Sequence, residues 1–474
     1  MRVLASSLTL ATVLWSTTAL AGTTPEGAAG LKTFFESWLG TAPGVVTVEE
    51  DGDAYRVTLD AAPLLKNLEA EGTVEVSPME LHLTDKGDGT WDFSYDQALS
   101  VEMAVPNAVE IDLEVKNIQG SGTFDPELAA VVASSSEFTG MDLYQKSFRP
   151  DGAIETEVTY HLDSGTSSST ATADGTGGVD ADLTYAIQGV TETFTAPGFE
   201  ATGLDKVTLT ARDYSGEGRI EGLRSAALQG LVAFAVAHAG DPDSDPLEAE
   251  LKALVSDSLP ILRHASMSGE VNDLAVTTPK GPVSVAAAGV LVEFNGVTLD
   301  GLLREAFTIN GLALPDGMVP DWAKSLVPSD LSLDLKLTRF DLDAPARLLL
   351  AATDPAMIDD AALLKAVLPE GSFDMTLAPG SVEAPAYRLG YEGQMSVTPG
   401  PFPPTGKARI TLSGIDAIRT ALEAAPEQDL RSALPTLGMA QAMSRPGENG
   451  ELVWEIEAAP GGAVSVNGAP LGGQ

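Results

Sequence analysis

The chain has 474 residues, with 27 Lys and Arg against 68 Asp and Glu, and its formal net charge is −41. An acidic surface of this kind disfavours nucleic acid, whose phosphates need clustered Lys and Arg, and charge-driven docking on anionic lipid headgroups. The sequence contains no Cys, which excludes disulfides, cysteine nucleophiles and lipid attachment at a cysteine.

The first residues have the pattern of an export signal. Arg2 precedes an apolar stretch over residues 4–15, and the small residues that follow end in Ala19-Leu20-Ala21 before Gly22, an A-x-A pattern. The apolar stretch is too short to span a bilayer comfortably, and Ser and Thr interrupt it. We therefore predict a signal peptide over residues 1–21, cleavage between Ala21 and Gly22, a periplasmic location and no transmembrane anchor in the mature chain.

Alternation of apolar and polar residues predicts most of the strands. Residues 109–116 read VEIDLEVK and residues 331–338 read LSLDLKLT, which is the period of two expected for antiparallel strands with one dry face. Asp51-Gly52 predicts a hairpin turn. Predicted strands fall near residues 45–49, 54–60, 73–76, 80–84, 90–95, 109–116, 154–162, 181–187, 206–211, 266–276, 283–294, 331–341, 372–377, 407–412 and 451–458.

Apolar residues at helical spacing predict three pairs of helices, each pair between two strands. Within the second pair, Asp354-Pro355 predicts the start of a helix. Within the third, Pro435 predicts a bend or a break. The recurring strand–helix–helix–strand order indicates a candidate threefold repeat. The pairs cover residues 223–239 and 247–263, then 344–352 and 356–367, then 414–424 and 427–443.

Composition divides the chain further. SGTSSSTATADGTGG, residues 164–178, predicts a flexible polar segment. The last residues, ELVWEIEAAPGGAVSVNGAPL, predict a terminal hairpin with a turn at Asn467-Gly468. The expected fold class is α+β and β-dominated, with extended, curved antiparallel sheets and helix pairs packed against them. The expected regions are an N-terminal β-rich region 22–163, the polar segment 164–178, a middle α+β region 179–330 and a C-terminal α+β region 331–474.

Motifs of common enzymes are missing from the sequence. There is no G-x-S-x-G elbow, phosphate loop or dinucleotide fingerprint, and the four histidines form no H-E-x-x-H motif. A serine triad assembled by folding stays open, because triads are recognised by geometry. We predict a protein that is not an enzyme, with no catalytic residues and no cofactor.

One acidic stretch offers a metal hypothesis. Asp241, Asp243 and Asp245 have the alternating spacing of a calcium loop, but Pro246 stands at the position of its turning Gly and Lys252 at that of its closing Glu. The alternative is a solvated turn between two helices in which Asp245 caps the second helix. The two mismatches favour the turn.

Large apolar residues share one face of several predicted strands. They are Trp91, Phe93, Tyr95, Leu333, Leu335, Trp454 and Ile456. One interpretation is ordinary core packing beneath helices. The other is that part of a long apolar face forms a groove for an acyl chain or another extended apolar molecule. The second interpretation stays open because the predicted helices are too few to cover all the predicted strands.

The C-terminal third carries a family resemblance. Gly414-Ile415-Asp416 opening a helix, Gly450 before Trp454, and the turn at Val466-Asn467-Gly468 resemble the end of an uncharacterised family of exported alphaproteobacterial proteins, DUF2125. This resemblance implies export, and because the shared motifs are structural, no catalytic residue can be carried over from it. In architecture the chain also looks like AsmA-like envelope proteins, which are associated with lipid traffic through β-grooves, although it lacks the retained transmembrane helix of their anchored members.

These observations lead to three functional hypotheses. The first is a non-enzymatic envelope protein that binds or shields an apolar molecule such as lipid in a β-lined groove. The second is a structural or assembly factor that contacts other envelope proteins through sheet edges or its acidic surface. The third is a metal-dependent hydrolase, which requires carboxylates converging in a cleft.

Overall fold

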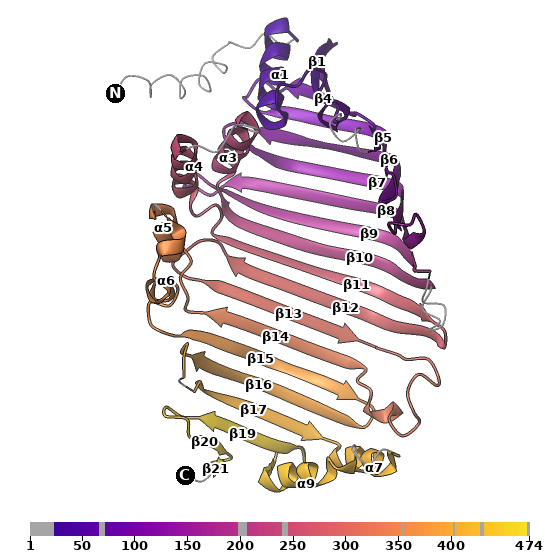
Figure 1. Cartoon of the computed structure of the whole chain (residues 1–474), viewed down its shortest axis with the longest axis vertical. Helices are drawn as coiled ribbons and strands as arrows, with labels where there is room; N and C mark the ends of the chain where they lie inside the picture. The colour runs from indigo at the N-terminus through magenta and orange to yellow at the C-terminus, as the bar shows by residue number, and fades with distance from the viewer. Residues whose placement is uncertain are drawn as a thin grey trace. The chain divides into compact units, whose positions relative to one another are not determined.

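The computed structural model describes residues 23–65, 72–197, 206–238, 245–352, 354–401, 403–426 and 431–471. Its strands belong to one large antiparallel sheet, with helices inserted between strands (Figure 1), which confirms the predicted α+β, β-dominated class. The chain divides into two compact units, Met1–Glu200 with Glu221–Ile261, and Ala201–Ile220 with Leu262–Gln474.

Long strands dominate the first unit. Each of β5 to β8 pairs antiparallel with the next strand in the chain. Shorter strands extend the ladder, because β1 pairs with β2, β2 with β4, and both β3 and β4 with β5. The strands are β1 Val46–Asp51, β2 Ala54–Leu59, β3 Thr73–Val76, β4 Met79–Asp85, β5 Trp91–Val105, β6 Val109–Asp125, β7 Ala130–Phe148, β8 Ile154–Ala173 and β9 Val179–Thr195.

Four helices belong to the first unit: α1 Pro25–Leu39, α2 Ala62–Leu65, α3 Ser225–Ala237 and α4 Asp245–Ser258. Helix α1, which the sequence analysis missed, begins with Pro at its first turn, and the Gly27 backbone N–H donates to the Thr24 hydroxyl at 3.0 Å. The Phe34 ring of α1 packs 5.5 Å from the Phe124 ring of β6, measured between centroids. Helix α1 therefore packs against β6 through this aromatic contact.

The prediction of a flexible segment over residues 164–178 is wrong. Strand β8 continues to Ala173, and only the turn before Val179 interrupts the ladder. The serines in this stretch are satisfied across the sheet, since Ser134–Ser169 and Ser136–Ser167 are hydroxyl pairs at 2.7 Å. Ser and Thr side chains that pair across strands stabilise a sheet, so a composition typical of linkers forms a regular strand here.

The second unit continues the antiparallel pattern. Strands β11 to β17 pair in chain order, and β17 then pairs with β19. The unit also contains most of β10 Lys206–Leu223. The other strands are β11 His264–Thr278, β12 Gly281–Asn295, β13 Leu302–Asn310, β14 Asp330–Thr338, β15 Phe373–Ala384, β16 Tyr387–Val397, β17 Thr405–Ser413, β18 Arg445–Pro446, β19 Leu452–Ala458, β20 Val464–Val466 and β21 Ala469–Leu471.

The predicted terminal hairpin is confirmed. Strand β19 pairs with β20 and β20 with β21, both antiparallel. Asn467 and Gly468 have φ of 50° and 79°, the left-handed conformation that a two-residue hairpin turn requires. The Asn467 side chain holds the turn in place, because its amide donates to the Met443 and Val453 carbonyls at 2.8 and 3.0 Å.

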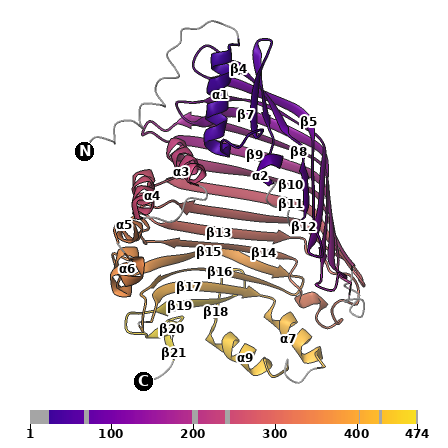
Figure 2. The same ribbon diagram turned by 45° about the horizontal axis from the view of Figure 1, so that its top comes forward.

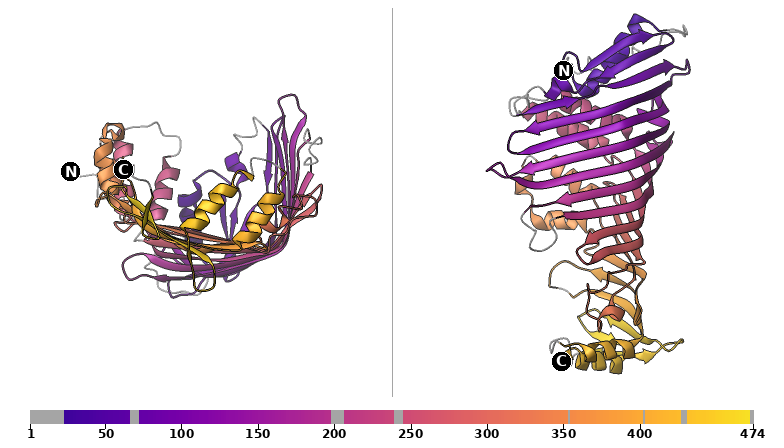
Figure 3. Two further views of the ribbon diagram at one scale, coloured as in Figure 1. Left: turned by 90° about the horizontal axis from the view of Figure 1, so that it is seen from below. Right: turned by 90° about the vertical axis from the view of Figure 1, so that its right-hand side faces the viewer.

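Helices of the second unit are inserted in the chain between strands that pair with each other in the sheet. In sequence, α5 Asp343–Ala351 and α6 Asp360–Val367 come between β14 and β15, and α7 Ile415–Ala424 and α9 Leu434–Met443 come between β17 and β19. With α3 and α4 between β10 and β11 along the chain, the strand–helix–helix–strand order occurs three times. Figures 1 and 2 show α5 and α6 at the ends of their strands, and Figure 3 shows α7 and α9 beside the last strands.

One helix start differs from the prediction, and one predicted helix break is confirmed. Pro355 begins a short 3₁₀ turn, Pro355–Met357, and α6 begins only at Asp360. A second such turn is Lys324–Leu326. The break predicted at Pro435 is confirmed: residue 431 is helical, residues 432 and 433 form a turn, and α9 begins at Leu434 with Pro435 in its first turn. Proline fits there because the first backbone N–H groups of a helix have no partner within the helix.

Candidate functional site: an apolar sheet face

Strand register places apolar residues of the second unit on one face. In an antiparallel pair, directly opposite residues point to the same side of the sheet, so the pairings define four rows of side chains across the strands. We call this surface the apolar face. From β11 onward its rows are Ala265, Phe294, Leu303, Leu337, Met375, Met395; Met267, Val292, Glu305, Leu335, Leu377; Gly269, Val290, Phe307, Leu333; and Val271, Ala288, Ile309, Leu331, Val382, Leu389.

The apolar face is open to solvent. Its exposed large side chains are Met267 at 56%, Val290 at 46%, Met395 at 42%, Leu333 at 41%, and Phe294 and Phe307 at 40%. A single exposed apolar residue is ordinary, but contiguous apolar surface marks a site of interaction with a ligand, a membrane or another protein. Five of these residues lie close together on β11 to β14, and Met395 lies on the same face on β16. They form the strongest candidate site in the described residues.

The opposite face of the same strands is charged. Arg304 of β13 donates to both carboxylate oxygens of Asp334 at 3.0 and 2.8 Å, and to Glu293 at 3.2 Å. The hydrogen bonds from Arg304 hold the pKa of Asp334 below its usual value. This face of the sheet is therefore charged and suited to contact with water. Its ion pairs do not account for the exposure of the apolar side chains on the other face.

Four of the sequence candidates lie on the apolar face or its continuation. Leu333 and Leu335 are in the rows above, and Ile456 and Trp454 of β19 oppose Ala408 and Ile410 of β17. Trp454 is half-buried, and its indole N–H donates to the Ala440 carbonyl of α9 at 2.8 Å. It therefore fastens α9 over the end of the face. The sequence analysis did not name Val290, Phe307 or Met395 as candidates. It did predict the strand near residues 283–294, which contains Val290.

The other three candidates belong to the first unit. Trp91, Phe93 and Tyr95 share one face of β5, and the Trp91 and Tyr55 ring centroids are 6.0 Å apart. The Phe93 and Tyr95 rings lie over glycines of β6: a Cβ at Gly122 or Gly120 would approach them to 2.5 Å. Aromatic side chains that lie over glycines of a neighbouring strand protect the ladder. This geometry favours the core-packing interpretation for Trp91, Phe93 and Tyr95.

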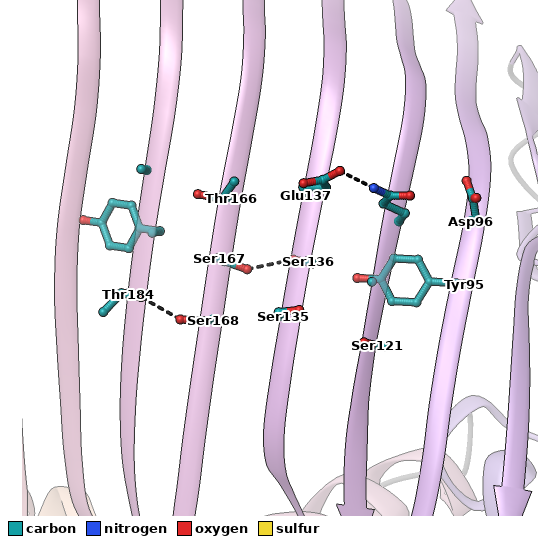
Figure 4. A pocket seen from close by; sticks show the side chains of 14 residues that line it. Tyr95, Asp96, Ser121, Ser135, Ser136, Glu137, Thr166, Ser167, Ser168 and Thr184 are labelled. Atoms are coloured by element: carbon teal, nitrogen blue, oxygen red, sulfur yellow. Dashed lines mark hydrogen bonds between the residues drawn. The ribbon is translucent and has the colours of Figure 1, made fainter.

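A shallow depression of about 610 Å³ lies over the middle of β5 to β9 (Figure 4). Hydroxyl groups dominate its lining, and they bond to one another: Ser136 with Ser167 at 2.7 Å and Ser168 with Thr184 at 2.8 Å. Tyr95 stands at one side. The depression is open and most of the residues that line it carry hydroxyl groups, so it is not an apolar groove of the kind considered for Tyr95.

The metal hypothesis gains nothing from the described residues. Asp241 and Asp243 lie outside them, as do Ala21 and Gly22 of the predicted cleavage site, and Asp245 is the first residue of α4. In the described part of the chain, no three His, Cys, Asp or Glu residues gather closely enough to hold a metal ion. No helix found there combines the length and apolar character needed to cross a bilayer.

A charged cluster that the sequence did not reveal lies in the first unit. His161 of β8 contacts Asp142 of β7 through Nδ1 at 2.6 Å and Asp163 through Nε2 at 3.1 Å. Hydrogen bonds to Asp142 and then to Asp163 raise the pKa of His161 above its usual value. Asp142 and His161 are opposite each other in the ladder, a proximity that their separation in sequence conceals.

We expect this cluster to make the stability of the first unit depend on pH. A raised pKa in the folded state means that the stabilisation is complete below pH 6.5, the ordinary pKa of histidine, and is lost as the pH rises through the folded pKa. His161 has a 40% exposed side chain, so solvent screening should keep the effect below about 1 kcal/mol. Thermal unfolding between pH 5.5 and 8.5 measures it.

The His161→Gln variant is the control, because it removes the titrating group. The difference in melting temperature between wild type and variant should shrink as the pH rises. A difference that stays constant over this range would contradict the assignment, and Asp142→Asn should reduce the same pH-dependent difference.

In comparisons with known proteins, no family model and no curated protein matches this sequence. The resemblances to DUF2125 and to AsmA-like proteins therefore stay predictions.

Proposed function

We propose that this protein binds the acyl chains of a lipid on the apolar face of β11 to β16. The single observation that carries the proposal is a set of six large apolar side chains on one face of β11 to β16, each at least 40% exposed. Covering such surface is favourable by about 25 cal/mol per Å². An extended apolar ligand gains this free energy along the whole face.

The size of the face suits an acyl chain. Five strand spacings of about 4.8 Å separate β11 from β16, which gives about 24 Å across the ladder. One leaflet of a bilayer contributes about half of a hydrocarbon core of about 30 Å, so an acyl chain is about 15 Å long. The face is thus long enough to hold a complete chain laid across the strands.

A second copy of the chain suits the face less well. Two copies would bring together two molecules of formal charge −41 each, and like charges oppose association unless salt screens them. A lipid chain carries no such charge onto the apolar face. The export signal and the periplasmic location predicted from the sequence fit a lipid ligand, and they stay predictions here.

Binding of a fluorescent phosphatidylcholine should detect the site. The triple variant Val290→Ser, Phe307→Ser, Leu333→Ser should lower the affinity for this probe at least tenfold, because each substitution removes about 1 kcal/mol of apolar contact. All three side chains are at least 40% exposed, so the variant should fold. Fluorescence titration below the critical micelle concentration measures the dissociation constant.

The matched control removes equally apolar side chains from the helical segments of the same unit. Leu349→Ser, Met357→Ser, Leu364→Ser changes residues that are 40%, 82% and 47% exposed, and its affinity should equal that of wild type. Equal losses in both triple variants would contradict a site on the apolar face. A wild-type protein that binds no probe, and that carries no lipid in native mass spectrometry after gentle purification, would overturn the proposal.

The second hypothesis, an assembly factor, draws on the same exposed surface. A partner protein could cover the apolar face with an amphipathic helix. Its signature would be a defined cross-linked partner that the Val290, Phe307, Leu333 triple variant loses, with no lipid bound to either protein.

A further inference from the structure

One charged residue interrupts the apolar face. Glu305 lies in β13 directly opposite Val292 of β12 and Leu335 of β14. Leu303 and Phe307, two positions away along the same strand, point to the same side. Glu305 is the only charged residue in the four rows of the face, and apolar side chains surround it on all four sides.

The Glu305 carboxylate differs from its charged neighbours. On the opposite face, Glu293 and Asp334 both receive hydrogen bonds from Arg304. Glu305 is exposed, and no cation or hydrogen-bond donor contacts its carboxylate among the residues that the structure describes. Water solvates this carboxylate as long as the face is open.

A ligand that covers the face must deal with this charge. Removing an ionised carboxylate from water without a partner costs several kcal/mol. A ligand that brings a cation to Glu305 avoids much of this cost, because the pair stays charged and hydrogen-bonded. A ligand that brings a second anion increases the cost, and the net charge of the chain adds to the repulsion.

We infer that Glu305 makes the face selective for phospholipids whose headgroup carries an ammonium, and that it excludes anionic lipids. This inference rests on the proposed lipid-binding function. The acyl chain lies over the apolar rows, and the ammonium group meets the Glu305 carboxylate between β12 and β14. Glu305 is then the residue that determines headgroup specificity.

The test compares two fluorescent phospholipids with identical acyl chains, a phosphatidylethanolamine and a phosphatidylglycerol. Wild-type protein should bind the phosphatidylethanolamine at least tenfold more tightly. Glu305→Gln should bring the two affinities within about threefold of each other, mainly by strengthening binding of the phosphatidylglycerol, because the neutral amide removes the repulsion.

Glu270→Gln is the matched control. Glu270 of β11 is exposed and lies one position from the Gly269 row, so its side chain points to the opposite face. This variant changes the net charge by the same amount as Glu305→Gln, and it should keep the wild-type preference. Unchanged unfolding midpoints for both variants show that the fold is intact.

The possible results distinguish a failure of this inference from a failure of the proposed lipid-binding function. Equal affinities of wild type for the two lipids, or a preference that Glu305→Gln leaves intact, would overturn the inference while lipid binding stands. A preference lost equally in Glu270→Gln would also overturn it, since total charge would be the cause. Failure of wild type to bind either lipid would end both the inference and the proposed function.

Discussion

Replacing Gly165 by valine is expected to destabilise the first unit by about 2–3 kcal/mol, the upper range for overpacking a well-packed site. Gly165 of β8 lies directly opposite Phe138 of β7, and a Cβ added there would overlap the Phe138 ring. The ring must leave its position, which strains its side chain and uncovers the β8 backbone. Urea unfolding followed by circular dichroism measures the loss.

A double variant tests the cause. Phe138→Ala in the Gly165→Val background removes the ring that clashes, so the two changes together should cost at least about 1 kcal/mol less than their sum. Gly230→Ala in α3 is the control, because a Cβ there meets no atom within 4 Å. It should be neutral or stabilise the unit by up to about 1 kcal/mol. Strict additivity of the Gly165 and Phe138 changes would show that the ring does not depend on the glycine.

Glycines inside strands explain why the sequence predicted the strands but not their full lengths. Alternation identified the core of β6 over residues 109–116, but the strand runs on to Asp125 through Gly120 and Gly122. In a sequence, glycine indicates a break. In the sheet, each of these glycines provides the flat surface on which an aromatic ring from the neighbouring strand rests, and that pairing depends on register.

Local periodicity succeeded where the signal was local. The three helix pairs were predicted because a period of 3.6 residues needs no knowledge of distant residues. Strands β7, β13 and β16 were missed. In β7, three consecutive serines, Ser134 to Ser136, break the alternation of apolar residues, yet the hydroxyls of Ser134 and Ser136 find partners in β8. Their compatibility with a strand appears only when the partner strand is known.

The candidate site shows the same limit. The sequence showed that Leu333 and Leu335 share one face of a strand. It did not show which residues of β13 and β15 lie beside them. Because β13 was missed, the isolated Glu305 went unnoticed, although an acid between Leu303 and Phe307 is visible in the sequence. The pairing register of the strands brings these side chains together on one face, and the register is set only in the folded sheet.

Replacing Trp454 by alanine is expected to cost about 3 kcal/mol, the low end of the range for deleting a large aromatic side chain, because the side chain is half-buried. The indole packs between β19 and α9 and donates to the Ala440 carbonyl at 2.8 Å. Chemical denaturation measures the loss, and hydrogen exchange locates it: amides of α9 should exchange faster than those of β14 and β15.

Trp454→Phe separates the two contributions. Phenylalanine keeps most of the apolar contact but cannot donate to Ala440, so it should cost about 1 kcal/mol, the value of a hydrogen bond between neutral groups. If alanine and phenylalanine cost the same, the hydrogen bond would account for the whole effect and packing for none. If alanine leaves both the unfolding midpoint and the exchange of α9 unchanged, Trp454 does not fasten the helix.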